Sequence, residues 1–144
     1  MQACRKHTLD VLALSEEVLG LTNIWYEPAL KHAFTVTLPS GQSIRVITAP
    51  FFLGTKMEAF RGRGKMDFQA SHDLEDFVAV IEGRETLLQE IAGAPLSLRR
   101  YLADAAKMLL AEPRFLDVLP GFVLDDERVP LIEKRLASIA ANIS

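Results

Sequence analysis

The hydrophobic pattern of this 144-residue chain changes its period at Pro50, and this change constrains the fold more than any other feature. Before Pro50, apolar and β-branched residues alternate with polar ones over Ala33–Leu38 and Ser43–Thr48, as in β-strands. The segment between them, Pro39–Gln42, suits a hairpin loop. After Pro50, apolar residues recur every three or four positions, as in amphipathic helices. Strands followed by helices indicate an α+β fold.

A third strand is expected at Thr8–Leu14, where Leu9 and Val11 alternate with Asp10. Ser15–Tyr26 is expected to form a loop with a short helical turn, and Pro28–Lys31 another turn. The predicted architecture is a small sheet of about three strands, residues 1–49, and about five helices, residues 50–144, in a single domain. The expected helices begin near Pro50, Ser71, Glu85, Ser97 and Pro130, with Ser71 as the N-cap of the second. A strand so near the chain start leaves a sheet edge open to a second copy of the chain, which predicts a homo-oligomer.

Composition and charge narrow the classes of function. Residues 1–70 carry eight Lys and Arg against six Asp and Glu, whereas residues 71–144 carry eight against thirteen. A site for a polyanion is therefore expected in the first half. Cys4 is the sole cysteine, which excludes an intrachain disulfide and fits a reducing cytoplasm. No apolar run approaches the roughly 18 residues of a membrane span, so we predict a cytoplasmic protein without a membrane partner.

Chemistry-bearing residues are densest in the segment Ala49–Ile81. The segment contains Lys56, Glu58, Ala59, the loop Arg61-Gly62-Arg63-Gly64-Lys65, Asp67, and the run His72-Asp73-Leu74-Glu75-Asp76. Together with Glu17–Leu30 and the hairpin, it resembles the C-terminal portion of bacterial nucleotidyltransferase-like proteins of the abortive-infection toxin group (AbiEii-like). The resemblance extends over nearly the whole chain from about Leu9, and the Ala49–Ile81 segment is its most specific part.

The resemblance implies transfer of a nucleotide from a nucleoside triphosphate to RNA or protein, with Mg²⁺ as cofactor, and a toxin–antitoxin setting. It implies that Asp10 is a catalytic metal ligand and that Lys56 contacts the nucleotide phosphates. Asp76 would orient the phosphate-binding groups. The cations that would hold the phosphates are Arg61, Arg63 and Lys65.

The sequence departs from the family pattern in its metal motif. Such enzymes hold Mg²⁺ with carboxylates at alternate strand positions, preceded by a Gly-Ser turn. This chain has neither a Gly-Ser dipeptide nor an Asp-x-Asp pair, which leaves Asp10 as the one candidate. We therefore predict a nucleotidyltransferase-fold protein that is catalytically incomplete as given and needs no cofactor. Two alternatives stay open: an active Mg²⁺-dependent enzyme completed by carboxylates from elsewhere, and a module that binds nucleic acid or a protein partner through the basic loop.

Each candidate residue also has an ordinary structural interpretation. Asp10 suits the solvent side of an edge strand. Lys56 suits either a partly buried position near the sheet or an exposed side chain whose stem covers apolar surface. The three loop cations suit a helix C-terminus, where they complement the helix dipole. Asp73 suits the first turn of the following helix for the same reason, whereas Asp76, further in, is expected to pair with Arg61, Arg63 or Lys56. His72 is expected on the surface, and Trp25 as an anchor on the core.

Overall fold

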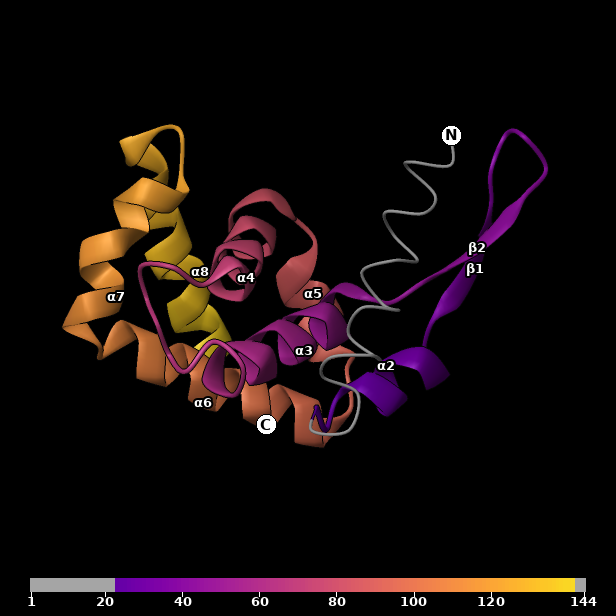
Figure 1. The fold of residues 1–144 in the computed structure, drawn as a ribbon, viewed down its shortest axis with the longest axis horizontal. Helices are drawn as coiled ribbons and strands as arrows, with labels where there is room; N and C mark the ends of the chain where they lie inside the picture. Colours follow the sequence, from indigo (N-terminus) through magenta and orange to yellow (C-terminus); the bar gives the residue numbers. More distant parts are fainter. Residues whose placement is uncertain (1–22, 142–144) are drawn as a thin grey trace.

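The computed structural model describes residues 23–141, and in this part the chain is mostly helical (Figure 1). Between these limits it forms one two-stranded antiparallel sheet and seven α-helices, with two short 3₁₀ helices near the end. The predicted α+β class is thus confirmed, with two strands in place of about three. The predicted strand Thr8–Leu14, and with it Asp10, lies outside the described residues.

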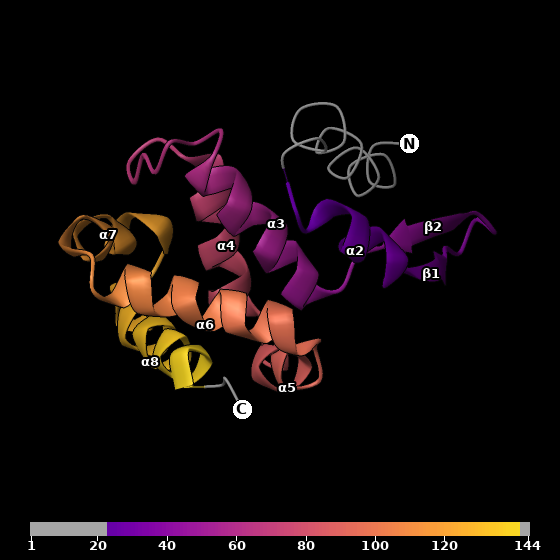
Figure 2. The same ribbon diagram turned by 90° about the horizontal axis from the view of Figure 1, so that it is seen from below.

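The predicted hairpin forms and extends away from the helices (Figures 1 and 2). Strand β1 (Phe34–Thr37) pairs with β2 (Ser43–Val46), with Phe34 opposite Val46 and Val36 opposite Ile44. These four residues share one face of the hairpin because side chains alternate along a strand. Ile44 is buried, whereas Phe34 is 49% exposed. The helical body therefore covers this apolar face only in part.

Helix α2 (Tyr26–Lys31) replaces the turn that the sequence predicts at Pro28–Lys31. A helix of six residues is too short to be stable alone, so packing has to hold it. Ala29 within it is fully buried, and Trp25 just before it lies edge-on to Phe51. The predicted role of Trp25 as an anchor on the core is confirmed.

The five predicted helices are confirmed, and α7 is an additional one. They are α3 (Ala49–Arg61), α4 (His72–Gly83), α5 (Leu87–Ala92), α6 (Leu96–Leu110) and α8 (Val129–Ala141), with α7 (Pro113–Val118) and the 3₁₀ helices η2 (Leu119–Phe122) and η3 (Asp126–Arg128) before the last. Helix α7 shows no helical period in the sequence because it buries a single side chain, Phe115, whereas the equally short α5 buries Leu87 and Ile91 one turn apart. Pro113 stands in its first turn, and Glu112 caps it by accepting from the backbone N–H of Arg114.

Helix α3 packs against both α4 and α6, and α6 in turn packs against α8 (Figure 2). The buried residues of α3 include Leu53, Met57 and Phe60, which recur at the predicted helical spacing. Because neighbours flank α3 on two sides, the polar residues between these apolar positions also meet other helices. Lys56 meets α4, and Glu58 meets α6.

Candidate functional site

Four charged side chains meet where α3 faces α4, and we call them the α3–α4 cluster: Lys56, Arg63, Asp73 and Asp76. The ammonium Nζ of Lys56 lies 2.9 Å from Oδ2 of Asp76 and 3.5 Å from Oδ1 of Asp73. Nη2 of Arg63 donates to Oδ2 of Asp73 at 2.9 Å. The structure thus brings together Lys56, Arg63 and Asp76 from the predicted site, and adds Asp73.

Local backbone features bring the two helices into this arrangement. The chain reverses direction after α3 through Lys65 and Met66, whose φ angles are 50° and 56°, in the left-handed region. Gly64 is required at this turn because a Cβ there would lie 2.8 Å from the carbonyl oxygen of Phe60. Ser71 then caps α4, its Oγ accepting from the backbone N–H of Leu74 at 3.1 Å. The predicted cap at Ser71 is confirmed.

Burial differs sharply among the members of the cluster. The side chains of Lys56 and Asp73 are 14% and 9% exposed, whereas those of Arg63 and Asp76 are 47% and 49% exposed. The interpretation of Lys56 as an exposed lysine is wrong, because the acids of α4 draw it into the interface. Asp73 is likewise more than a carboxylate at a helix start, since it pairs with two cations. The expected pairing of Asp76 with Lys56 is confirmed.

The cluster is electrically balanced, with two cations and two carboxylates. An ammonium has three N–H donors, and two carboxylates are within reach of Lys56. The Nζ atom also lies 5.3 Å from the centroid of the Phe52 ring, a distance typical of a cation–π contact. The acids hold Lys56 in this orientation, and the carboxylate of Asp76 is the more exposed of the two.

The remaining cations of the basic loop take other positions. The guanidinium of Arg61 lies 5.3 Å from the ring centroid of Tyr101 on α6. Lys65 is exposed and forms no ion pair with any of residues 23–141. His72 is exposed, as expected, with Nδ1 3.5 Å from Glu75. The three predicted phosphate-binding cations therefore have three different surroundings, and only Arg63 joins Lys56.

A second polar contact lies on the other side of α3. The hydroxyl of Tyr101 donates to Oε1 of Glu58 at 2.6 Å, and the Tyr101 ring lies edge-on to Trp25. Burial raises the pKa of Tyr101 well above its ordinary value, and the hydrogen bond to Glu58 raises this pKa further. This pair is not predictable from the sequence, because no local pattern connects two residues that are 43 positions apart.

The predicted Mg²⁺ ligands are carboxylates, and within residues 23–141 carboxylates form no cluster of three that could hold a metal ion. No group of three or more His, Cys, Asp or Glu in this part of the chain is arranged to hold a metal ion. The two carboxylates of the cluster are already engaged by Lys56 and Arg63. Asp10, the predicted metal ligand, lies outside the described residues.

Comparison with family models, curated proteins and solved structures found no match to this chain. The resemblance to nucleotidyltransferase-like proteins therefore stays a prediction. Among residues 23–141, no helix combines the length and apolar character needed to cross a membrane.

Proposed function

We propose that this chain is a nucleotidyltransferase-like protein in which Lys56 contacts the phosphates of a nucleoside triphosphate. The observation that supports the proposal is the placement of Lys56, 14% exposed and flanked by two carboxylates of α4. All four members of the cluster come from the segment that resembles this class of protein. A lysine held by two acids keeps one orientation, which a phosphate-binding group requires.

We also propose that this chain by itself does not catalyse nucleotide transfer. Transfer by metal ions requires several converging carboxylates, and the sequence contains neither the Gly-Ser turn nor the Asp-x-Asp pair. The carboxylates of α4 neutralise Lys56 and Arg63 instead. The chain is then a nucleotide-binding protein that depends on groups from elsewhere for catalysis.

Nucleotide binding tests the role of Lys56. Titration calorimetry with each of the four ribonucleoside triphosphates should show binding that weakens about tenfold or more in Lys56→Met, because a charge-assisted contact is lost. Lys107→Met, at an exposed position of α6, is the matched control and should bind as the wild type does. Asp76→Asn should strengthen binding, because it removes the carboxylate that competes with phosphate for Lys56.

Two results would contradict the proposal in different ways. If none of the triphosphates binds, or if Lys56→Met binds as the wild type does, Lys56 is part of a structural ion-pair network and nothing more. Radiolabelled nucleoside triphosphate incubated with the protein, Mg²⁺ and bulk tRNA tests the second part. Incorporation above that of Asp10→Asn would show that the chain is an active nucleotidyltransferase.

A second candidate function, binding of nucleic acid through the basic loop, is favoured by Arg61 and Lys65. Both side chains are exposed, and neither forms an ion pair with residues 23–141. They could therefore meet phosphates without losing a carboxylate partner, unlike Lys56 and Arg63. The dependence of RNA affinity on salt concentration tests this function independently of nucleotide binding.

A further inference from the structure

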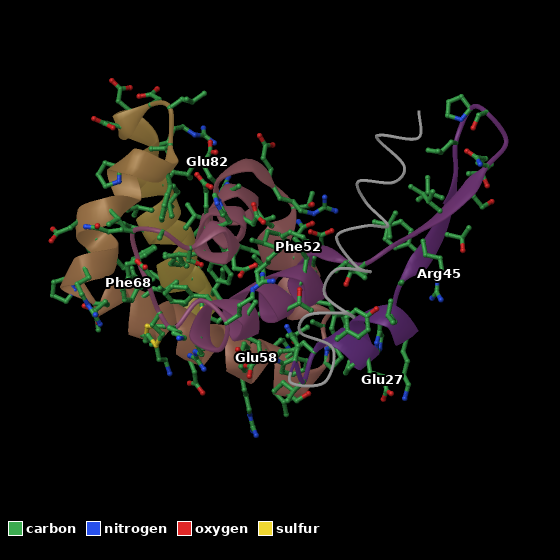
Figure 3. The ribbon with its side chains drawn as sticks, viewed as in Figure 1. Glu27, Arg45, Phe52, Glu58, Phe68 and Glu82 are labelled. Carbon is green, nitrogen blue, oxygen red and sulfur yellow. The ribbon has the colours of Figure 1, made fainter. Side chains whose placement is uncertain are left out.

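A groove of about 460 Å³ lies between the base of the hairpin and helix α4. Its apolar lining includes Phe34 and Val46 from the hairpin, Phe52 from α3, and Ala79 and Val80 from α4. Phe52, labelled in Figure 3, lies in the part of α3 that is nearest the hairpin. The volume is within the range of small-ligand sites, and mostly apolar walls are typical of them.

Small residues on α4 keep this groove open. Asp76, Ala79, Val80 and Gly83 lie on one face of α4, since they are spaced three or four positions apart along a helix. Ala79 is exposed, and a Cβ atom added at Gly83 would have no atom within 4 Å. Larger side chains at these two positions would therefore fill the groove without a clash at the backbone.

The groove begins where the α3–α4 cluster ends. Phe52 lines the groove and lies one helical turn before Lys56, whose ammonium is 5.3 Å from the Phe52 ring centroid. On α4, Val80 lines the groove one turn after Asp76. An occupant that starts at Lys56 and continues into the groove thus meets a cation first and then two phenyl rings, those of Phe52 and Phe34.

We propose that this groove binds the nucleoside part of the nucleotide, an inference that rests on the proposed contact between Lys56 and the phosphates. With its phosphates at Lys56, a nucleotide would bring its planar base against the rings of Phe52 and Phe34. Bases stack on aromatic side chains irrespective of their sequence. At the groove wall the guanidinium of Arg84 pairs with Glu90, Nη2 to Oε2 at 2.7 Å, and Thr48 adds a hydroxyl. These groups can donate to and accept from the edge of a base or the hydroxyls of a ribose.

The experiment compares nucleotides with inorganic tripolyphosphate, which has the phosphates and no nucleoside. Titration calorimetry on the full chain, at equal Mg²⁺, measures both affinities for the wild type and for the two groove-filling variants, Gly83→Leu and Ala79→Trp. Ala137→Trp is the matched control, because Ala137 is exposed on α8 and does not line the groove. Circular dichroism verifies that each variant is folded.

We expect the wild type to bind at least one ribonucleoside triphosphate about tenfold more tightly than tripolyphosphate, as stacking of one base would provide. Gly83→Leu and Ala79→Trp should remove this preference and leave tripolyphosphate affinity unchanged, whereas Ala137→Trp should retain it. Equal affinity of the wild type for both anions, or an unchanged preference in both groove variants, would overturn the inference and leave the role of Lys56 intact. If neither anion binds, the proposed function fails and the inference fails with it. Self-association that only the groove variants lose, with nucleotide preference unchanged, would assign the groove to a second copy.

Discussion

Helix α3 has two polar faces, and the contacts that they make with neighbouring helices differ in kind. Lys56 and Glu58 are two residues apart, which places them about 200° apart around the helix axis. On one face, Lys56 meets two carboxylates of α4, and half of the Asp76 side chain stays exposed. On the other, Glu58 accepts a single short hydrogen bond from Tyr101 of α6, beside the buried ring of Trp25.

The difference shows which face can respond to a ligand. The Lys56 face is held by ion pairs, one of which opens to solvent, so an incoming anion can exchange with Asp76. The Glu58 face is held by a neutral donor on a charged acceptor among aromatic rings, and exchange there would leave a partly buried carboxylate without its donor. This difference supports the proposed placement of ligand binding on the Lys56 face, whereas the Glu58 face attaches α6 to α3.

The largest effect on stability is expected when Asp73, the most buried member of the α3–α4 cluster, is replaced. Asp73→Ala should lower the free energy of unfolding by about 3 kcal/mol, because Lys56 and Arg63 lose a common partner that is 9% exposed. Asp104→Ala, at an exposed position of α6, should change this free energy by no more than about 0.5 kcal/mol. Urea denaturation measures both. A loss below about 1 kcal/mol for Asp73→Ala would mean that apolar packing alone joins α3 to α4.

A smaller effect is expected on the Glu58 face. Tyr101→Phe should lower the free energy of unfolding by about 2 kcal/mol, because the carboxylate of Glu58 loses its hydroxyl donor. The variant should leave nucleotide affinity unchanged, whereas Lys56→Met should reduce it. Urea denaturation and titration calorimetry on the same two variants compare the faces directly. Weaker nucleotide binding by Tyr101→Phe would contradict the assignment of the two faces.

The pH dependence of stability tests the Tyr101–Glu58 contact on the Glu58 face separately from the ion pairs of the Lys56 face. Burial and Glu58 raise the pKa of Tyr101 in the folded protein, whereas an unfolded tyrosine ionises near pH 10. The unfolded chain therefore releases this proton first, so the contribution of Tyr101 is fully present below about pH 10 and is lost as pH rises toward its raised pKa. The stability difference between wild type and Tyr101→Phe should shrink above pH 10. A difference that is constant up to pH 11 would contradict a buried, hydrogen-bonded phenol.

The smallest effect on stability is expected when cations of the basic loop Arg61–Lys65, at the end of α3, are replaced. Arg61→Ala should cost about 0.5–1 kcal/mol through the lost contact with the Tyr101 ring, and Lys65→Ala less than about 0.5 kcal/mol. If the loop binds single-stranded RNA, log affinity falls as log salt concentration rises. This negative slope should become less steep by roughly 0.7 for each cation removed. Filter binding at several salt concentrations measures the slope, with Lys107→Ala as control. An unchanged slope in the double variant would exclude RNA binding by these two residues.

Local patterns in the sequence were sufficient for most of the fold. The hairpin, the five predicted helices and the cap at Ser71 depend on periodicity and on residues within a few positions of one another. The same reasoning gave Asp76 a cationic partner. Helices α2 and α7 were not predicted as helices because each buries one side chain, Ala29 in α2 and Phe115 in α7, whereas the equally short α5 buries Leu87 and Ile91 one turn apart.

The tertiary structure decided which charges are buried. The sequence allows Lys56 to be either partly buried or exposed, and makes Asp73 an ordinary acid of a first helical turn. Because α4 packs against α3, the side chain of Asp73 is 9% exposed and that of Lys56 14% exposed, and the two charges, 3.5 Å apart, replace part of each other's hydration. A sequence records the charge of a side chain, but its exposure depends on which distant element packs over it.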